Sequence, residues 1–218
     1  MRLYSYFRST TSYRVRIALN LKGCAYETVP IHLLREGGEQ YKESYSAVNP
    51  MNELPTLQVL DESGHEIARI GQSVAILEYL EECFPEPALL PQKPLDRALV
   101  RQRLEVVNSS IHPVQNLKVM RKLTQDFGTD RPRNFAWAAY WIERGFRGLE
   151  VLLEQSAGRY SVGDAITLAD IALVPQVYNA RKFGVDVNAF PMIERVDAAC
   201  RELEAFQLSA PDAQPDFE

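Results

Sequence analysis

A proline-rich segment near the middle of the chain is the feature that most limits how the chain can fold. Residues 84–94 contain Pro85, Pro87, Pro91 and Pro94. Because proline lacks an amide hydrogen and clashes with the preceding helical turn, a helix cannot continue through this segment. The segment therefore predicts a linker that divides the 218-residue chain into two domains.

The part of the chain before the linker has the pattern of a small α/β domain. Its apolar runs and turn residues predict strands at 2–7, 26–31, 56–60 and 66–70. Apolar residues at helical spacing predict helices at 12–22 and 73–83. This order of elements predicts a thioredoxin-like domain over residues 1–83.

The part of the chain after the linker, residues 95–218, loses the strand signals and is predicted to be all-helical. Apolar periodicity predicts helices at 95–127, 134–155, 168–182 and 192–203. Residues 112–117, which include a proline, are expected to interrupt and bend the first of these helices. Thr167 and Asp170 have the spacing of a capping box, which gives them a structural role at the start of the third helix.

Charge and cysteine content exclude several classes of function. The net charge of −5 argues against a nucleic-acid partner, and no apolar run approaches the length that spans a membrane. Cys24, Cys83 and Cys200 are widely spaced, which argues against a disulfide framework or a zinc site and favours the cytoplasm. The three histidines form no metal-ligand cluster, so no metal is expected.

Four consecutive hydroxyl side chains, Ser9 to Ser12, lie where the first predicted strand gives way to the first helix. One hydroxyl is enough to cap a helix, and capping alone is the structural alternative. The free N–H groups of the first helical turn attract negative charge, and further hydroxyls can donate to the same anion. The cluster therefore predicts a site for a thiolate, a carboxylate or a phosphate.

Three motifs then carry a resemblance to a known family. They are Arg-Val-Arg-Ile-Ala-Leu at 14–19, Asn-Pro-Met-Asn-Glu-Leu-Pro-Thr-Leu at 49–57 and Gln-Ser-Val-Ala-Ile-Leu-Glu-Tyr-Leu at 72–80. With weaker matches at 162–176 and 203–207, the likeness extends over essentially the whole chain. The chain resembles the cytosolic glutathione transferases, and within them the zeta class of maleylacetoacetate and maleylpyruvate isomerases.

The resemblance implies glutathione as the cofactor and assigns roles to the hydroxyl cluster. Ser9 is the expected donor to the glutathione thiolate, with Thr10 and Thr11 in support. Thr11 stands where the zeta class has cysteine, so a cysteine mechanism at that position is excluded. Donors at a helix N-terminus lower the pKa of a thiol from its usual value of about 8.5.

The resemblance also implies how the rest of glutathione is held. The backbone of Leu54, before a cis Pro55, is expected to contact the cysteinyl part. Gln72 and Ser73 are expected to bind the γ-glutamyl carboxylate, and Gln115 is expected to reach glutathione from the helical domain.

The implied reaction is the conversion of maleylacetoacetate to fumarylacetoacetate in tyrosine and phenylalanine catabolism. The thiolate adds to a conjugated double bond, the bond rotates, and elimination of the thiolate restores the double bond. The diketo-acid substrate is a dicarboxylate, so Arg8 and Arg181 are predicted as carboxylate clamps. His112 is a candidate acid, base or hydrogen-bonding group, and the family implies a homodimer.

Several alternatives stay open on the sequence. Maleylpyruvate, an intermediate of gentisate breakdown, differs from maleylacetoacetate by a short carbon unit, which pockets discriminate weakly. A transferase acting on small halogenated acids would use the same thiolate. A non-enzymatic interaction protein of this fold would be expected to lose Ser9, Leu54, Pro55, Gln72 and Ser73, and all of these are present.

Overall fold

The computed structural model describes residues 1–218, which form two compact units. The first unit comprises Met1–Ala88 together with Leu203–Glu218, and the second comprises Leu89–Glu202. This differs from the expected organisation, which assigned all of residues 95–218 to the helical domain. The second unit begins inside the proline-rich segment, and the carboxyl-terminal segment belongs to the first unit.

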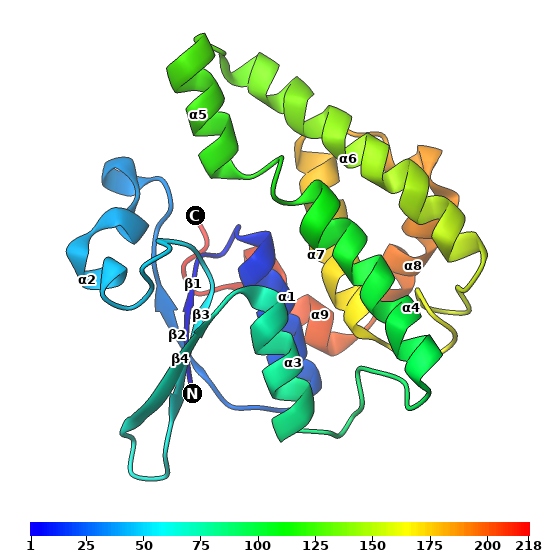
Figure 1. Ribbon diagram of the computed structural model, residues 1–218, viewed down its shortest axis with the longest axis horizontal. Coiled ribbons are helices and arrows are strands. Elements are labelled where there is room, and N and C mark those ends of the chain that lie inside the picture. The colour runs from blue at the N-terminus through cyan, green and yellow to red at the C-terminus, as the bar shows by residue number, and fades with distance from the viewer. The chain divides into compact units, whose positions relative to one another are not determined.

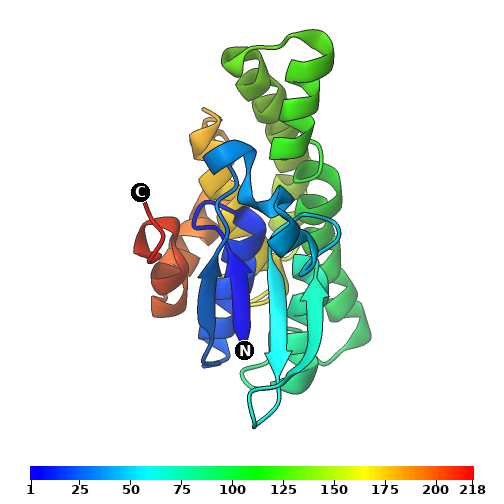
Figure 2. The same cartoon turned by 90° about the vertical axis from the view of Figure 1, so that its left-hand side faces the viewer.

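A four-stranded sheet forms the centre of the first unit (Figure 2). The strand order is β2-β1-β3-β4, in which β1 pairs parallel with β2 and antiparallel with β3, and β3 pairs antiparallel with β4. The elements are β1 (Arg2–Ser5), α1 (Thr10–Leu21), β2 (Glu27–Pro30), α2 (Glu43–Ser46), β3 (Thr56–Leu60), β4 (Glu66–Gly71), α3 (Ser73–Cys83) and α9 (Glu204–Ser209). This is the expected thioredoxin-like arrangement.

Helices α1 and α3 pack side by side on one face of the sheet (Figure 1). The core between them contains apolar side chains that are 0% exposed, among them Leu3 of β1, Ile17 of α1, Leu57 of β3 and Leu77 of α3. Burying such side chains supplies the main free energy that holds the layers together. The start of α1 is thereby fixed at the end of β1.

The carboxyl-terminal segment joins the first unit because α9 packs against α1. Arg16 Nε donates to the carbonyl of Ser209 over 3.0 Å, and Asn20 Nδ2 donates to Ser209 Oγ over 2.7 Å. Tyr13 Oη donates to the carbonyl of Phe206 over 3.5 Å. These partners lie far apart in the sequence, so periodicity alone could not pair them.

The second unit is helical, as expected. Its helices are α4 (Pro94–Glu105), α5 (Leu117–Phe127), α6 (Arg131–Glu154), α7 (Leu168–Lys182) and α8 (Pro191–Arg201). None of the helices of the chain is long and apolar enough to cross a membrane.

The long helix expected over 95–127 is two helices, because α4 gives way to a π-helical turn at Val106–Ile111 and α5 starts anew at Leu117. The interruption expected at 112–117 is therefore present, and it begins earlier than expected. Asn116 caps α5, since its Oδ1 accepts from Lys118 N over 3.1 Å.

The capping box at the start of α7 is confirmed. The Asp170 carboxylate accepts from Thr167 N at 2.8 Å, Thr167 Oγ1 at 2.9 Å and Ser161 N at 2.7 Å. Asp170 is fully buried, and that burial raises the pKa of its carboxyl group even though these hydrogen bonds oppose the shift. The side chain therefore joins the start of α7 to the preceding loop.

Candidate active site in the first unit

A chain of hydrogen bonds runs from the start of α1 to the loop before β3. Ser9 Oγ accepts from Ser12 N over 3.2 Å, which caps α1, and lies 3.0 Å from Thr11 Oγ1. Thr11 Oγ1 donates to the carbonyl of Leu54 over 2.9 Å. Because the Thr11 hydrogen is engaged there, the Ser9 hydroxyl is the donor within the Ser9–Thr11 pair. Ser9 thus has a hydroxyl hydrogen that rotation can redirect toward an incoming anion.

Ser9 and Thr11 are partly exposed, whereas Thr10 and Ser12 are buried. Thr10, the first residue of α1, is 4% exposed, and Ser12 is 0% exposed. The Ser12 hydroxyl makes no hydrogen bond. Of the four hydroxyls, those of Ser9 and Thr11 are therefore the ones within reach of a ligand.

The peptide bond between Leu54 and Pro55 is cis, as the resemblance implied. Tyr45 supports the preceding loop, since its hydroxyl donates to the carbonyl of Glu53 over 2.7 Å. Burial raises the pKa of Tyr45 to about 12, so the phenol keeps its hydrogen at neutral pH. The loop presents the backbone of Leu54 beside the start of α1.

The N-terminus of α3 is open to an anion. Ser73 is the first residue of α3, and no side chain caps the helix. Its first-turn N–H groups therefore carry the positive end of the helix dipole without a capping partner. Gln72 precedes them with φ of 64°, a left-handed conformation that strains a residue other than glycine.

A buried arginine supports this second helix start. Arg14 of α1 is 0% exposed, and its Nη1 donates to Ser73 Oγ over 3.3 Å. Gln72 Nε2 donates to Glu53 Oε2 over 3.3 Å, which joins α3 to the loop before Pro55. The structure thus brings together Ser9, Thr11, Leu54, Pro55, Gln72 and Ser73.

Arg14 and Arg16 have roles that were not predicted from the sequence. Both are fully buried in a helix whose other buried positions are largely apolar. The signal in the sequence was the presence of two arginines within the apolar pattern of the helix predicted at 12–22. Arg16 holds the turn between β1 and α1, because its Nη2 donates to the Phe7 carbonyl over 3.0 Å and its Nη1 to Ser5 Oγ over 3.1 Å.

Arg8 lies in that same turn, directly before Ser9. Its guanidinium carbon sits 5.4 Å from the centre of the Phe7 ring and 5.8 Å from that of Tyr6. Arg8 Nε is buried and has no hydrogen-bond partner. Because Arg8 as a whole is partly exposed, its guanidinium charge suits a carboxylate ligand.

The residues predicted from the helical domain all lie in the second unit. Gln115 is 2% exposed, and its amide is held by Gln176 and Asn179 of α7, each over 3.3 Å. His112 is partly exposed and directly follows the π-helical turn. Its backbone N–H donates to the carbonyl of Val107. Their expected roles toward ligands stay predictions.

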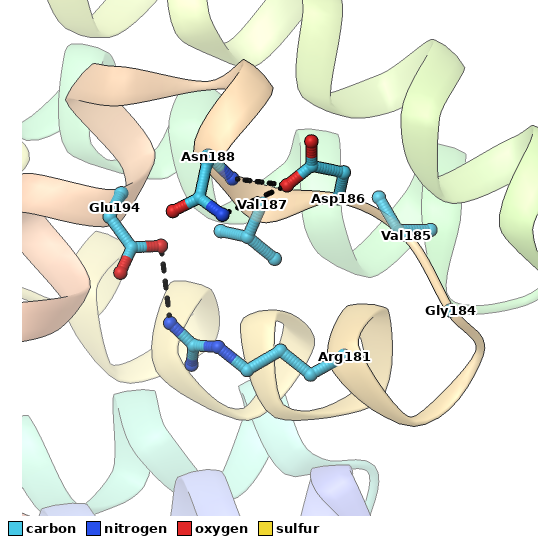
Figure 3. A pocket seen from close by; sticks show the side chains of 7 residues that line it. All are labelled: Arg181, Gly184, Val185, Asp186, Val187, Asn188 and Glu194. Carbon is cyan, nitrogen blue, oxygen red and sulfur yellow. Dashed lines mark hydrogen bonds and ion pairs between the residues drawn. The ribbon is translucent and has the colours of Figure 1, made fainter.

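Arg181 points into a hollow of the second unit that is lined by residues 184–188 and Glu194 (Figure 3). Its Nη1 lies 2.8 Å from Asp197 Oδ2 and its Nη2 3.3 Å from Glu194 Oε2. Asp197 also pairs with Arg201 over 3.1 Å. Two carboxylates already neutralise Arg181, so a role as a substrate clamp would require these ion pairs to open. We therefore favour Arg8 over Arg181 for that role.

No three histidine, cysteine, aspartate or glutamate side chains gather as a set of metal ligands.

Comparison with known proteins places this geometry in a family. Residues 3–88 match the glutathione S-transferase N-terminal domain. The chain is 47% identical to maleylacetoacetate isomerase of Rattus norvegicus over 214 residues, which is 98% of this chain and 94% of the rat protein.

Two solved structures share the whole fold. A bacterial maleylpyruvate isomerase, described as a glutathione S-transferase of the zeta class, superposes with a TM-score of 0.93 at 46% identity and 100% coverage of both chains. Maleylacetoacetate isomerase of Anaeromyxobacter dehalogenans, with glutathione bound in its active site, superposes with a TM-score of 0.89 at 47% identity. That match covers 100% of this chain and 97% of the other.

Proposed function

The chain belongs to the zeta class of the glutathione S-transferase family, and from that premise we propose that it is a glutathione-dependent maleylacetoacetate isomerase. The observation that carries the proposal is the hydrogen-bonded chain Ser9–Thr11–Leu54 at the N-terminus of α1. It places a redirectable hydroxyl and a helix dipole where a sulfur anion is stabilised.

The residues of the first unit fit glutathione. Its γ-glutamyl carboxylate matches the uncapped N-terminus of α3, where Ser73 offers a hydroxyl supported by buried Arg14. Its cysteinyl backbone matches the polar backbone groups of Leu54 before cis Pro55. Thr11 links the Leu54 backbone to the start of α1, and Gln72 links the start of α3 to Glu53.

Bound glutathione supplies the thiolate that adds to the conjugated double bond and leaves again after the bond has rotated. The Ser9 hydroxyl donates to the sulfur and favours its ionised form, because a charge-assisted hydrogen bond stabilises the anion more than the neutral thiol. Thr11 keeps the Leu54 carbonyl and the Ser9 hydroxyl aligned. Neither residue becomes covalently attached to the substrate.

Arg8 binds the substrate in this proposal. The diketo acid carries carboxylates, and negative charge accumulates on its keto oxygens when the double bond becomes single. A guanidinium beside the thiolate site stabilises both charges. The adjacent Tyr6 and Phe7 rings restrict where the guanidinium can move.

Maleylpyruvate is the second candidate substrate, because the 46% identical zeta-class structure that superposes over the whole chain is a maleylpyruvate isomerase. We also propose a homodimer, as the family resemblance implies, which light scattering after size-exclusion chromatography tests. Free Cys24, Cys83 and Cys200 support a reducing, cytoplasmic location.

The test follows the absorbance of maleylacetoacetate and of maleylpyruvate with and without glutathione. We expect loss of maleylacetoacetate that requires glutathione without consuming it. Consumption of glutathione with halogenated acids alone would indicate a conjugating transferase. Failure to bind a glutathione-affinity column, with no turnover of either diketo acid, would indicate a non-enzymatic protein.

A further inference from the structure

We propose that Asp216 is a positioning residue for the proposed isomerase reaction, acting through the turn that carries Arg8 and Ser9. The inference rests on the proposed function, because it concerns the same thiolate site. Asp216 lies in the carboxyl-terminal segment of the first unit, more than two hundred residues from that turn.

The contact that links them is a hydrogen bond from Phe7 N to Asp216 Oδ2 over 3.0 Å. Phe7 is 2% exposed, so water cannot readily replace the carboxylate as the acceptor for this N–H group. The next two residues in the chain are Arg8 and Ser9. Asp216 therefore fixes the peptide unit between Tyr6 and Phe7, which directly precedes the proposed substrate clamp and the thiolate donor.

The other polar group of Phe7 is fixed as well. Its carbonyl accepts from Arg16 Nη2 over 3.0 Å, and the Tyr6 carbonyl accepts from Ser9 N over 2.9 Å. The turn is thus held by Arg16 on its carbonyl side and by Asp216 on its N–H side. Removing either hydrogen bond would let the turn between β1 and α1 move on the side that this bond holds.

Two neighbours of Asp216 fasten the same segment, which we call the strap (Asp216–Glu218). The Phe217 ring packs edge-on against the Phe7 ring, with centroids 5.5 Å apart and an interplanar angle of 87°. The Glu218 carboxylate pairs with His32 and Arg35. Three successive strap residues therefore hold the strap against the first unit, so the position of Asp216 is determined.

The hydrogen bonding of Asp216 argues for a role beyond stability. Its second oxygen, Oδ1, is buried and has no hydrogen-bond partner. Buried polar atoms are normally paired, and one left unpaired lowers stability. The presence of a carboxylate with one unpaired oxygen is better explained by the contact that its other oxygen makes with Phe7 N than by a gain in stability.

Positioning and direct electrostatics make opposite predictions for the thiolate. The negative charge of Asp216 disfavours a nearby anion, so removal of the charge alone would lower the pKa of the glutathione thiol. Loss of the acceptor for Phe7 N lets the turn shift and moves the Ser9 hydroxyl away from the sulfur. That movement raises the pKa of the glutathione thiol. The sign of the shift therefore separates the two effects.

The experiment compares Asp216→Ala, Asp216→Asn and the control Asp212→Ala, which changes an exposed residue of the carboxyl-terminal segment outside the strap. The readouts are the pKa of bound glutathione, titrated through the ultraviolet absorbance of the thiolate, and kcat/KM for maleylacetoacetate. Circular dichroism verifies that each variant is folded. Asp216→Asn keeps an acceptor for Phe7 N, whereas Asp216→Ala does not.

We expect Asp216→Ala to raise the thiol pKa by about half a unit or more and to lower kcat/KM about tenfold. Asp216→Asn and Asp212→Ala should stay within about twofold of wild type. A wild-type thiol pKa in folded Asp216→Ala would overturn the proposal. So would a thiol pKa lowered by half a unit in Asp216→Asn, which decides the question even if Asp216→Ala does not fold.

The titration also separates this inference from the proposed function. If wild-type protein does not lower the pKa of glutathione at all, the proposed function fails. If wild-type protein lowers the pKa and Asp216→Ala lowers it equally, only the positioning role fails.

Discussion

Replacing Ser9 by alanine removes two interactions at once, and their magnitudes can be worked out separately. Ser9 Oγ caps α1 by accepting from Ser12 N over 3.2 Å, and we propose that its hydroxyl donates to the glutathione thiolate. Loss of an N-cap costs about 1 kcal/mol of unfolding free energy. For a chain of this size that lowers Tm by about 2–4 °C.

The catalytic loss is expected to be larger than the loss of stability. A hydrogen bond to a charged group contributes about 1.5–3 kcal/mol. Since about 1.4 kcal/mol corresponds to a factor of ten, Ser9→Ala should lower kcat/KM about ten- to hundredfold. The same free energy raises the pKa of the bound thiol by about one to two units.

Three further variants distinguish the role of Ser9 as the N-cap of α1 from its role as the donor to the thiolate. Glycine caps a helix only a few tenths of a kcal/mol less well than serine but has no hydroxyl, so Ser9→Gly should lose activity with little change in Tm. Ser9→Thr keeps both functions and should keep most of the activity. Ser12→Ala is the matched control, because the Ser12 hydroxyl makes no hydrogen bond.

The assay is the glutathione-dependent loss of maleylacetoacetate absorbance, with thermal unfolding followed by circular dichroism on the same samples. A folded Ser9→Gly variant whose kcat/KM lies within twofold of wild type would refute the role of Ser9 as the thiolate donor. Equal losses in Ser9→Gly and Ser12→Ala would show that disruption of the hydroxyl cluster, and not one donor, causes the effect.

The remaining predictions concern stability and pH, each measured by thermal or urea unfolding. Gly145→Ala should lower the free energy of unfolding by about 1–3 kcal/mol, because the new Cβ would lie 2.2 Å from Ile111. Gly148→Ala on the same helix meets no atom within 4 Å and should raise the free energy of unfolding by about 0.4–1 kcal/mol. Equal effects of the two substitutions would contradict the packing argument. Asp170→Ala should cost about 2–5 kcal/mol, since two backbone N–H groups lose a buried acceptor; a loss under 1 kcal/mol would contradict that role. Hydrogen bonds from His32 and Arg35 hold the pKa of the Glu218 carboxyl group below its usual range. The stability that this carboxylate contributes is therefore present above pH about 4 and is lost as the pH falls through the lowered pKa. Glu218→Gln should remove that acid-side loss, and a pH dependence of Tm unchanged in the variant would show that the ion pairs contribute nothing.

The sequence predicted the four strands of the first unit and its helices α1 and α3 because each of these has a strong local signal. Helix α3 begins at Ser73 and ends at Cys83, and β3 runs from Thr56 to Leu60, as the residue pattern predicted. The hydroxyl cluster was identified from the residues themselves, whereas the cis peptide bond before Pro55 and the anion site at the start of α3 were implied by the resemblance to the zeta class.

What the sequence could not predict depends on contacts between distant residues. Nothing local in Leu203–Glu218 indicates that it packs with α1, or that Asp216 accepts from Phe7 N. The burial of Arg14 against Ser73 depends on how α1 and α3 pack. The proline at 113 indicated an interruption at 112–117, but no local pattern indicated the π-helical turn that precedes it at Val106–Ile111.

The central claim is that the N-terminus of α1, with the Ser9 hydroxyl, holds the sulfur of glutathione in its ionised form. The most direct measurement is a pH titration of glutathione bound to the wild-type protein, followed by the ultraviolet absorbance of the thiolate. We expect a pKa at least about one unit below the value of about 8.5 for a free thiol. A bound thiol that titrates at or above the free value would contradict the account.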